Sequence, residues 1–428
     1  MELICCMNVR RWITLFGYLL FIGMMVTGYY YNLTFVQFGL LDLGTRLIGL
    51  SEQRVALHMA ALALLTCAIA LGFGFLMQRR GWGREFRLKL RLAFGVVSIQ
   101  TILTGLAPFI RNEWLLLLWI VVASGTLGVG VPVTFGLTVD LIPTRHRGYV
   151  AAAITAAAYF AAAALSSAWQ IEAYAAQMLW LMLAGTAGLG LLAFGPFTFI
   201  DALAQQHQQP EFRYGRLVRQ RGTERAPADA RLFILIGLMF GVYFVDSLGF
   251  LRLADTPIYF DTAWQSPELE PRLFIGGVHV LGAFIGGVLY SAIGVRRLLL
   301  WIFGIFALVH LMYTFDIRVE SDASAPLVMP MLYALTVSLY TVVNFALWAD
   351  LSTPDIICLN SALGVALSGW TATFLSTALA MYWTTTGMLL EEHLRLVDAL
   401  AMLFFLTLLI LTFAPRTSAR RWAEGAGR

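Results

Sequence analysis

The sequence predicts an all-α membrane protein that crosses the bilayer twelve times, and three observations carry that prediction. Apolar residues make up 59% of the 428 residues and charged residues only 13%, about half the charged share of a soluble domain. The apolar residues fall into twelve blocks, each long enough for the ~20 helical residues that a bilayer core requires. The basic residues gather in alternate segments between the blocks. This composition excludes disordered, collagen-like, disulfide-stapled and nucleic-acid-binding proteins.

The predicted spanning helices follow one another along the whole chain. The first begins after Arg10 and Arg11, which resemble the basic start of a signal peptide. The apolar stretch is too long for a signal peptide and has no small-residue cleavage site, so we expect a spanning helix. We place the twelve helices near residues 13–38, 55–77, 92–110, 115–140, 149–171, 178–200, 231–253, 273–293, 298–315, 327–349, 358–382 and 397–414.

The distribution of Lys and Arg predicts the orientation. With a cytoplasmic N-terminus, 22 of the 29 basic residues fall in the inner segments and 7 in the outer ones, as the positive-inside rule requires. A missed or false helix would invert half of that count, so the asymmetry supports the number twelve as well. Both termini are therefore predicted to be cytoplasmic. The use of one Lys, Lys89, among so many Arg, together with much Ala and Leu, indicates a GC-rich bacterial genome. The predicted location is therefore the inner membrane of a bacterium.

A polar stretch over residues 201–230 divides the chain into six spans and six. It is charged and rich in Gln, which predicts a solvated cytoplasmic linker with room for a short surface helix. A basic patch for anionic lipid headgroups is the alternative. The predicted organisation is a bundle over residues 1–200, the linker, and a second bundle over residues 231–428.

The two bundles share an internal repeat. At an offset of 213 residues several features coincide, and one more pair matches at an offset of 210. These matches predict two pseudo-symmetric six-helix halves, with a substrate site at their interface near mid-membrane. The matching pairs are Gly28 with Gly241, Asp42 with Asp255, Gly74 with Gly287, Gly81 with Gly294, Arg84 with Arg297, and Asp140 with Asp350.

The loops after the second and eighth spans carry a family signal. They read Gly74-Phe-Leu-Met-Gln78-Arg79-Arg80-Gly81-Trp-Gly-Arg84 and Gly287-Val-Leu-Tyr-Ser291-Ala-Ile-Gly294-Val-Arg296-Arg297. Both resemble the major facilitator superfamily signature Gly-x-x-x-Asp-Arg-x-Gly-Arg-Arg. The end of the fourth span, Gly125-x-x-Gly128-x-Gly130-x-Pro132, resembles the same superfamily. The resemblance covers the whole chain and implies a transporter fold of twelve helices, with helices 1, 4, 7 and 10 around a central cavity.

The sequence also departs from that pattern. Gln78 and Ser291 stand where the signature has Asp. The drug–proton antiporters of the superfamily carry an Arg in helix 4, where this chain has Val121, and a Gly-Pro motif that the fifth span lacks. The resemblance therefore implies no substrate class.

Charged residues at the inner ends of the spans are candidates for a cytoplasmic gate. Alternating access needs contacts that hold one side shut and can break, and a partly desolvated Arg–Asp pair is suitable. We expect Arg84 to pair with Asp140, and Arg297 with Asp350, in an outward-open state. A purely structural role in turns and topology is the alternative. The candidate gating residues are Arg79, Arg84, Asp140, Arg145, Arg147, Arg296, Arg297 and Asp350.

Asp246 is the foremost candidate for a binding group within the membrane. Ionisable side chains inside a span are costly and usually face a cavity. Asp246 lies about 22 Å along the seventh helix and is the only acidic residue that we place well inside a span. It would bind a proton, a cation or a cationic group of a substrate. The alternative is an ion pair with Arg252 or Arg46, which are otherwise expected near the outer mouth.

Further polar and aromatic residues are candidates for the same site, with packing as the alternative for each. His279 suits proton coupling because histidine titrates near neutral pH; His58 and His310 are weaker candidates. The three consecutive tyrosines from Tyr29 cannot all face one way, and an outer aromatic belt is another interpretation of them. The candidates are Tyr29, Asn32, Tyr243, His279, Asn344, Trp348 and Trp370.

The predicted function is secondary active transport of a small solute by alternating access, with proton coupling as one option. The chain has no phosphate-binding Gly-x-x-x-x-Gly-Lys motif, so an ion gradient or passive flow would drive transport. We expect no cofactor, no metal, no nucleic-acid partner and no enzymatic activity, and we expect a monomer in the lipid bilayer. The alternatives are a non-transporting protein of the same fold that assists pigment or lipid assembly, and, less favoured, a membrane-embedded enzyme.

Overall fold

The structure is a computed structural model that describes residues 2–165, 170–213, 215–217, 230–254, 259, 263–318 and 327–413. Within those residues twelve helices are long and apolar enough to cross a membrane, so the predicted number is confirmed. The main helices are α1 (Glu2–Tyr31), α3 (Glu52–Arg80), α4 (Phe86–Leu106), α5 (Glu113–Gly136), α7 (Arg147–Leu165), α8 (Ile171–Phe194), α11 (Ala230–Ala254), α13 (Leu269–Ala292), α14 (Val295–Arg318), α15 (Val328–Asp350), α17 (Thr371–Thr385) and α18 (Leu390–Phe413). Shorter helices are α2 (Leu40–Asp42), α6 (Thr138–Leu141), α9 (Phe199–Gln206), α10 (Pro210–Arg213) and α16 (Ile357–Ser361).

Two of the spans contain π-helical segments. The first span continues beyond α1 through η1 (Asn32–Gly39), and the eleventh runs from α16 through η6 (Ala362–Trp370) into α17. Wide turns of this kind are rare and concentrate at functional sites, because they displace side chains from the regular helical positions. Both segments contribute residues to the cavity described below, among them Asn32 and Trp370.

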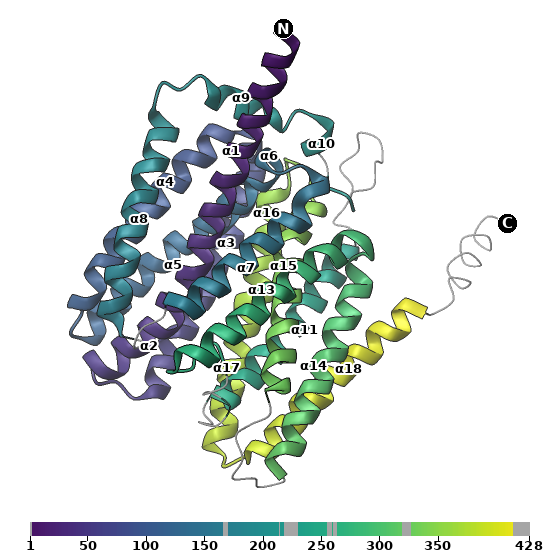
Figure 1. Cartoon of the computed structure of the whole chain (residues 1–428). Coiled ribbons are helices and arrows are strands. Elements are labelled where there is room, and N and C mark those ends of the chain that lie inside the picture. Colours follow the sequence, from purple (N-terminus) through teal and green to yellow (C-terminus); the bar gives the residue numbers. More distant parts are fainter. Residues whose placement is uncertain are drawn as a thin grey trace, which may run out of the picture.

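Helix packing repeats in the two halves of the chain. In the first half α3 packs on α5, α4 on α8, and α1 on α7. In the second half the equivalent helices form the equivalent pairs, α13 on α15, α14 on α18, and α11 on α17. Figure 1 shows the purple-to-teal helices of the first half beside the green-to-yellow helices of the second. The same packing scheme in both halves is the physical counterpart of the sequence repeat.

The repeated glycines lie where the two halves cross. A Cβ atom on Gly287 of α13 would lie 3.0 Å from the carbonyl oxygen of Gly148 on α7. A Cβ atom on Gly74 of α3 would lie 3.0 Å from the carbonyl oxygen of Cys358 on α16. A side chain at either position would push the halves apart, so these glycines permit close helix approach.

The loop glycines of the repeat end the helices that precede them. Gly81, after α3, has φ +71°, and Gly294, after α13, has φ +80°. Only glycine adopts these left-handed conformations without strain, and it is the residue that most often ends a helix in this way. The predicted tight turns after the second and eighth spans are therefore confirmed.

The described part of the linker packs against the protein. α9 contacts α1 and α6, with Ile200 and Leu203 buried, and Phe212 of α10 is also buried. Figure 1 places α9 and α10 beside α6, at the end of the molecule that carries the start of α1. We call this end the inner face, because its loops are the ones predicted to be cytoplasmic. The short surface helix that the sequence allowed in the linker is α9, which packs through its apolar residues while Asp201 and Gln205 are exposed; residues 214 and 218–229 lie outside the described part of the chain.

Candidate functional site

A central cavity of about 940 Å³ lies between the two halves. Helices α1, α5, α11 and α15, which are the first, fourth, seventh and tenth spans, all contribute to its wall. Its volume is within the range of small-molecule sites. Seven of the eight predicted binding residues line it: Tyr29, Asn32, Tyr243, Asp246, His279, Asn344 and Trp370.

Asp246 occupies this cavity on one face of α11. The cavity-lining residues Tyr243, Asp246, Ser247 and Phe250 are spaced three and four apart, so they share that face. Tyr333 of α15 donates a hydrogen bond to Asp246 Oδ1 over 2.5 Å and also contacts its backbone carbonyl at 3.0 Å.

A second tyrosine also donates a hydrogen bond to the Asp246 carboxylate. The Tyr340 hydroxyl donates to Asp246 Oδ2 over 2.5 Å. Tyr333 and Tyr340 are seven apart on α15, so both hydroxyls project from one helix face toward the carboxylate. Two neutral donors orient the group and leave its charge uncompensated.

No cationic side chain compensates Asp246 within the described residues. Every lining residue other than Asp246 is apolar, neutral polar or histidine, and no ion pair to Asp246 forms in this part of the chain. The alternative partner Arg46 instead binds Asp42 at 2.7 Å and Glu172 at 2.5 Å. The side chain of Arg252 lies outside the described residues.

A stacked aromatic group forms another wall of the cavity. Tyr29 and Tyr159 share a hydroxyl hydrogen bond of 2.9 Å. Tyr159 stacks face to face on His279, with ring centroids 4.1 Å apart, and His279 Nδ1 lies 2.9 Å from the Ser338 hydroxyl. The contact with Ser338 fixes one ring nitrogen of His279. Together the three contacts join α1, α7, α13 and α15 around the cavity.

The aromatic-belt interpretation of the three tyrosines is wrong. Tyr30 and Tyr31 are only 4% and 3% exposed, and Tyr31 stacks on Phe35 with centroids 4.9 Å apart. Tyr29 faces the cavity together with Asn32, as expected for residues three apart.

Trp348 is the predicted binding residue that the structure places elsewhere. It is fully buried and does not line the cavity. Its ring lies against Gly364, where a Cβ atom would approach within 2.1 Å, and its indole N–H donates to Asn344 Oδ1 over 2.9 Å. Trp348 therefore orients the lining residue Asn344 rather than contacting a bound molecule.

Other ionisable groups lie off the cavity. His58 hydrogen bonds to the Arg54 carbonyl and has Nε2 3.3 Å from Glu113, while His310 bonds to the carbonyl of Phe306. Asp398 lies within α18, because that helix begins earlier than predicted, at Leu390. Asp246 is therefore not the only acidic residue well inside a span, although Asp398 does not line the cavity.

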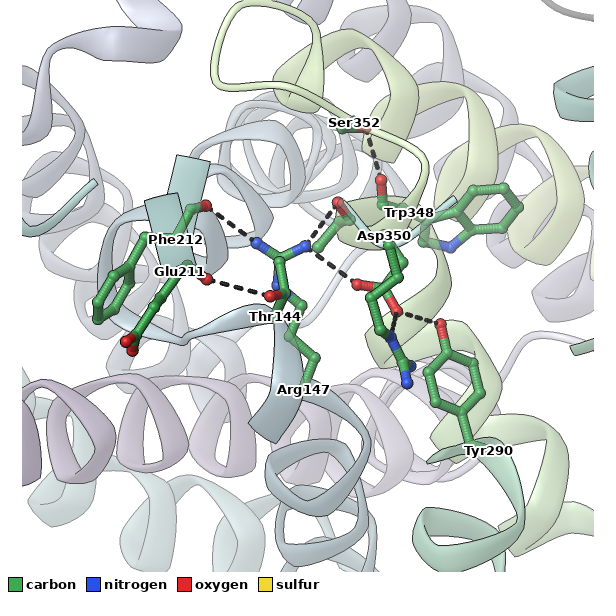
Figure 2. A network of polar contacts seen from close by, with 10 residues as sticks. Thr144, Arg147, Glu211, Phe212, Tyr290, Trp348, Asp350 and Ser352 are labelled. Carbon is green, nitrogen blue, oxygen red and sulfur yellow. Dashed lines mark hydrogen bonds and ion pairs between the residues drawn. The ribbon is translucent and has the colours of Figure 1, made fainter. Parts of the chain in front are cut away.

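An ion pair joins the two halves at the inner end. Arg147, at the start of α7, lies 3.1 Å from Asp350 Oδ1, at the end of α15, and both are at most 1% exposed. Arg147 also donates to the carbonyl oxygens of Ala349 at 2.8 Å and Phe212 at 3.3 Å. Figure 2 shows the guanidinium between these groups. We call Arg147, Arg216, Tyr290 and Asp350 the inner network.

The other two members bind the second carboxylate oxygen. Arg216 Nε donates to Asp350 Oδ2 over 2.7 Å, and the Tyr290 hydroxyl donates to it over 3.0 Å. The Arg216 guanidinium also lies 4.8 Å from the centre of the Tyr290 ring. Burial lowers the pKa of Arg216, but Asp350 and Tyr290 raise it by more, so the net direction is upward. Arg216 therefore keeps its charge at neutral pH.

The linker also forms backbone hydrogen bonds with the chain at the end of α15. The Gly215 N–H donates to the Ser352 carbonyl over 3.1 Å, and the Leu217 N–H donates to the Asp350 carbonyl over 2.9 Å. A Cβ atom at Gly215 would lie 2.1 Å from that Asp350 carbonyl oxygen. Only glycine fits, so the linker is held directly across the end of α15.

The predicted gate pairs are wrong in their partners. Arg84 pairs with Asp355, again across the two halves, and Asp140 pairs with Lys89. Arg297 is exposed, and Asp350 takes Arg147 and Arg216 as its cations. The reason is geometric: a one-dimensional repeat matches residues at equivalent places, whereas ion pairs form between whichever groups the helix ends bring together.

The remaining gate candidates lie at the surface. Arg79 and Arg145 are exposed, and Arg296, also exposed, donates to the Leu411 carbonyl over 3.2 Å. Within the described residues none of these three forms an ion pair.

The Lys89–Asp140 pair is buried at the inner end of the first half. Both side chains are fully buried, Lys89 donates to the carbonyl oxygens of Gly83 at 2.7 Å and Gly136 at 3.1 Å, and His207 Nδ1 lies 3.6 Å from Asp140. Breaking a buried pair is costly because one charge stays uncompensated.

We expect Lys89→Met to destabilise the protein by about 3 kcal/mol, because Asp140 would remain buried without its cation. The measurement is unfolding in detergent followed by circular dichroism. Lys89→Met combined with Asp140→Leu should recover much of the loss. A double variant as unstable as the single one would contradict this account.

The sequence contained signals for residues that our prediction missed. Tyr333 and Tyr340 lie seven residues apart in the tenth span, and Tyr340 lies four residues before the predicted Asn344, which is the spacing of one helix face. Lys89 stood out as the only lysine. Nothing in the pattern indicated Arg216, because its role depends on how the linker folds.

Within the described ranges, no group of three or more His, Cys, Asp or Glu residues is placed to hold a metal ion.

Comparisons with known proteins place the fold. No protein-family model matches the sequence, and no curated protein does. The structure resembles that of the MFS (major facilitator superfamily) proton:xylose symporter XylE bound to 6-bromo-6-deoxy-D-glucose, with a TM-score of 0.62 and 15% identity over 94% of this chain and 96% of that one. It also resembles the human organic anion transporter MFSD10 (TETRAN), with a TM-score of 0.59 and 15% identity over 92% of this chain and 98% of that one. The protein therefore has the multi-pass membrane fold of the major facilitator superfamily, as the sequence motifs predicted.

Proposed function

We propose that the protein is a secondary transporter that moves a small solute by alternating access. The observation that carries this proposal is the combination of a central cavity between two equivalent halves with ion pairs that, among the described residues, join those halves at the inner face. Rocking of the halves about the cavity would break these pairs and open the cavity to the inside.

The strengths of these ion pairs suit an inner face that can close and reopen. Arg147–Asp350 is buried and multiply hydrogen bonded, whereas Arg84–Asp355 is largely exposed. An exposed pair contributes ~1 kcal/mol or less, and a buried pair gives back much of its attraction as desolvation cost. When the inner face opens, water would solvate both charges and offset the lost contacts.

Asp246 is the group that would couple the cavity to an ion or to the charge of a substrate. It is a carboxylate in the cavity wall, held by two tyrosine hydroxyls and without a cation among the described residues. Such a group takes up a proton or a cation readily, and either event would change the charge of the cavity. The bilayer and a small-molecule solute are the proposed partners, and protons are the proposed coupling ion.

We expect the inner and outer ends to open alternately. Spin labels at Arg80→Cys and Arg297→Cys would report the inner face, and labels at Glu52→Cys and Glu270→Cys the outer face, in protein whose native cysteines are replaced by serine. All four positions are exposed. Transport predicts that the inner distance lengthens as the outer one shortens when a solute panel is tested with an imposed proton gradient.

The same measurement separates the proposed function from its alternative. A protein of this fold that only assists assembly would keep both label distances fixed under every solute and gradient. That result, together with no solute-dependent movement of protons or solute in proteoliposomes, would refute transport.

A further inference from the structure

We propose that the transported molecule is an amphiphilic organic cation, whose ammonium head lies at Asp246 and whose hydrocarbon tail lies in a side arm of the cavity between α1 and α8. This inference rests on the proposed transport function and names its substrate class. Two observations carry it independently, the charge of the cavity and its shape.

The charge of the cavity selects a cation. Asp246 is the one carboxylate among the described lining residues, and no Arg or Lys lines the cavity with it. An anionic ligand would be buried beside a like charge without a counter-ion, which is strongly unfavourable. A cationic head instead supplies the positive partner that the described lining residues do not give Asp246.

Aromatic rings surround the same carboxylate. Tyr333 and Tyr340 bind it, Tyr243 lies edge to face against Tyr340 with centroids 5.0 Å apart, and Phe250 lies 6.5 Å from Tyr333. Ring faces attract ammonium groups, most strongly where water is excluded. A carboxylate within a group of aromatic rings is therefore suited to a substituted ammonium group.

The shape of the cavity adds an apolar arm. The cavity continues from the Asp246 region to Leu19 and Gly23 of α1 and to Leu181, Gly185 and Gly188 of α8. A Cβ atom added at Gly23, Gly185 or Gly188 would meet nothing within 4 Å, so the space beside these glycines is open.

This arm reaches the side of the protein. Leu19 is 62% exposed and Leu181 is 45% exposed, although both lie within spanning helices. At that depth the surrounding medium is lipid hydrocarbon rather than water. A tail in the arm would stay in an apolar environment along its length, while the charged head reaches the carboxylate. A small polar cation would leave the apolar arm empty, and a neutral lipid would leave the carboxylate of Asp246 without a cationic partner.

The test measures binding of radiolabelled octyltrimethylammonium to the full-length protein in nanodiscs, with empty nanodiscs as blank. Competitors are tetramethylammonium, the butyl and hexyl homologues, octanol and octyl sulfate. We expect affinity to rise about fourfold for each added methylene, because that factor corresponds to the free energy of burying one CH₂ group. We expect octanol to bind at least about tenfold more weakly than the cation, and octyl sulfate not to compete.

Two variants separate the head from the tail. Asp246→Asn should reduce cation affinity at least about tenfold and make the cation no better than octanol. Gly185→Leu should fill the arm, abolish the gain with chain length and leave tetramethylammonium binding unchanged. Gly72→Leu is the matched control, because Gly72 is an exposed helical glycine with open space that does not line the cavity.

The outcomes decide the proposal without reference to transport. Competition by octyl sulfate equal to that of the cation, wild-type binding by Asp246→Asn, or identical behaviour of Gly185→Leu and Gly72→Leu would each overturn it. If Asp246→Asn does not fold, the preference of the wild-type protein for the cation over octyl sulfate still tests the proposal. Alternating label distances with another solute, combined with no cation binding, would refute the substrate class and leave the proposed transport function standing.

Discussion

Asp246→Asn should abolish gradient-driven accumulation of the transported solute in proteoliposomes. The substitution removes the charge of the cavity but keeps its shape, because the amide oxygen can still accept from one tyrosine and the amide group can donate to the other. Without a carboxylate the cavity cannot alternate between a charged and a neutralised state. Accumulation should fall to the level of protein-free vesicles.

Exchange of solute without a gradient shows which role the carboxylate has. Retained exchange would assign Asp246 to the proton, whereas loss of both activities would assign it to a cationic substrate, as our further inference requires. Asp398→Asn is the matched control, since Asp398 also lies within a span but does not line the cavity. Normal accumulation by a well-folded Asp246→Asn protein would remove Asp246 from both roles.

Asp350→Asn should shift the protein strongly toward a conformation open at the inner face. Asp350 is the shared acceptor of Arg147, Arg216 and Tyr290. Without its charge two guanidinium groups remain unpaired, one of them fully buried, at a cost of about 3–5 kcal/mol to the closed state. The population of the open state relative to the closed one should rise by roughly two to four orders of magnitude.

The inner label pair at Arg80→Cys and Arg297→Cys measures that shift. Asp355→Asn is the control, because Asp355 also joins the two halves but its pair with Arg84 is largely exposed and contributes less than about 1 kcal/mol. Equal shifts in the two variants, or an unchanged inner distance in folded Asp350→Asn protein, would show that the inner network does not hold the inner face closed.

The sequence alone determined the number of spans and the features that recur between the halves. Both follow from quantities that are local in the chain. A spanning helix satisfies its own backbone hydrogen bonds, so its length and apolar composition are enough to identify it. Gly81 and Gly294 end their helices through their own backbone conformation, and Gly74 and Gly287 mark close helix approach by having no side chain.

The candidate cavity residues were also largely predictable, for a related reason. A polar side chain such as Asp246 or Asn344 inside an apolar helix needs a cavity or a partner, whatever the arrangement of the other helices. That argument does not distinguish a residue that lines the cavity from one that packs in the protein interior. Trp348 was expected in the cavity, but contact with Gly364 from another helix buries it.

Only the tertiary structure decided which charges pair and how the cavity is shaped. Asp140 takes Lys89, and Asp350 takes Arg147 and Arg216, because the ends of helices from different parts of the chain meet there. The two tyrosines at Asp246 come from α15, 87 and 94 residues away in the sequence, and the apolar arm exists because α1 and α8 leave open space between them. Helix existence is set by local hydrogen bonding and composition, whereas pairing and cavity shape depend on distances between helices, which a single sequence does not contain.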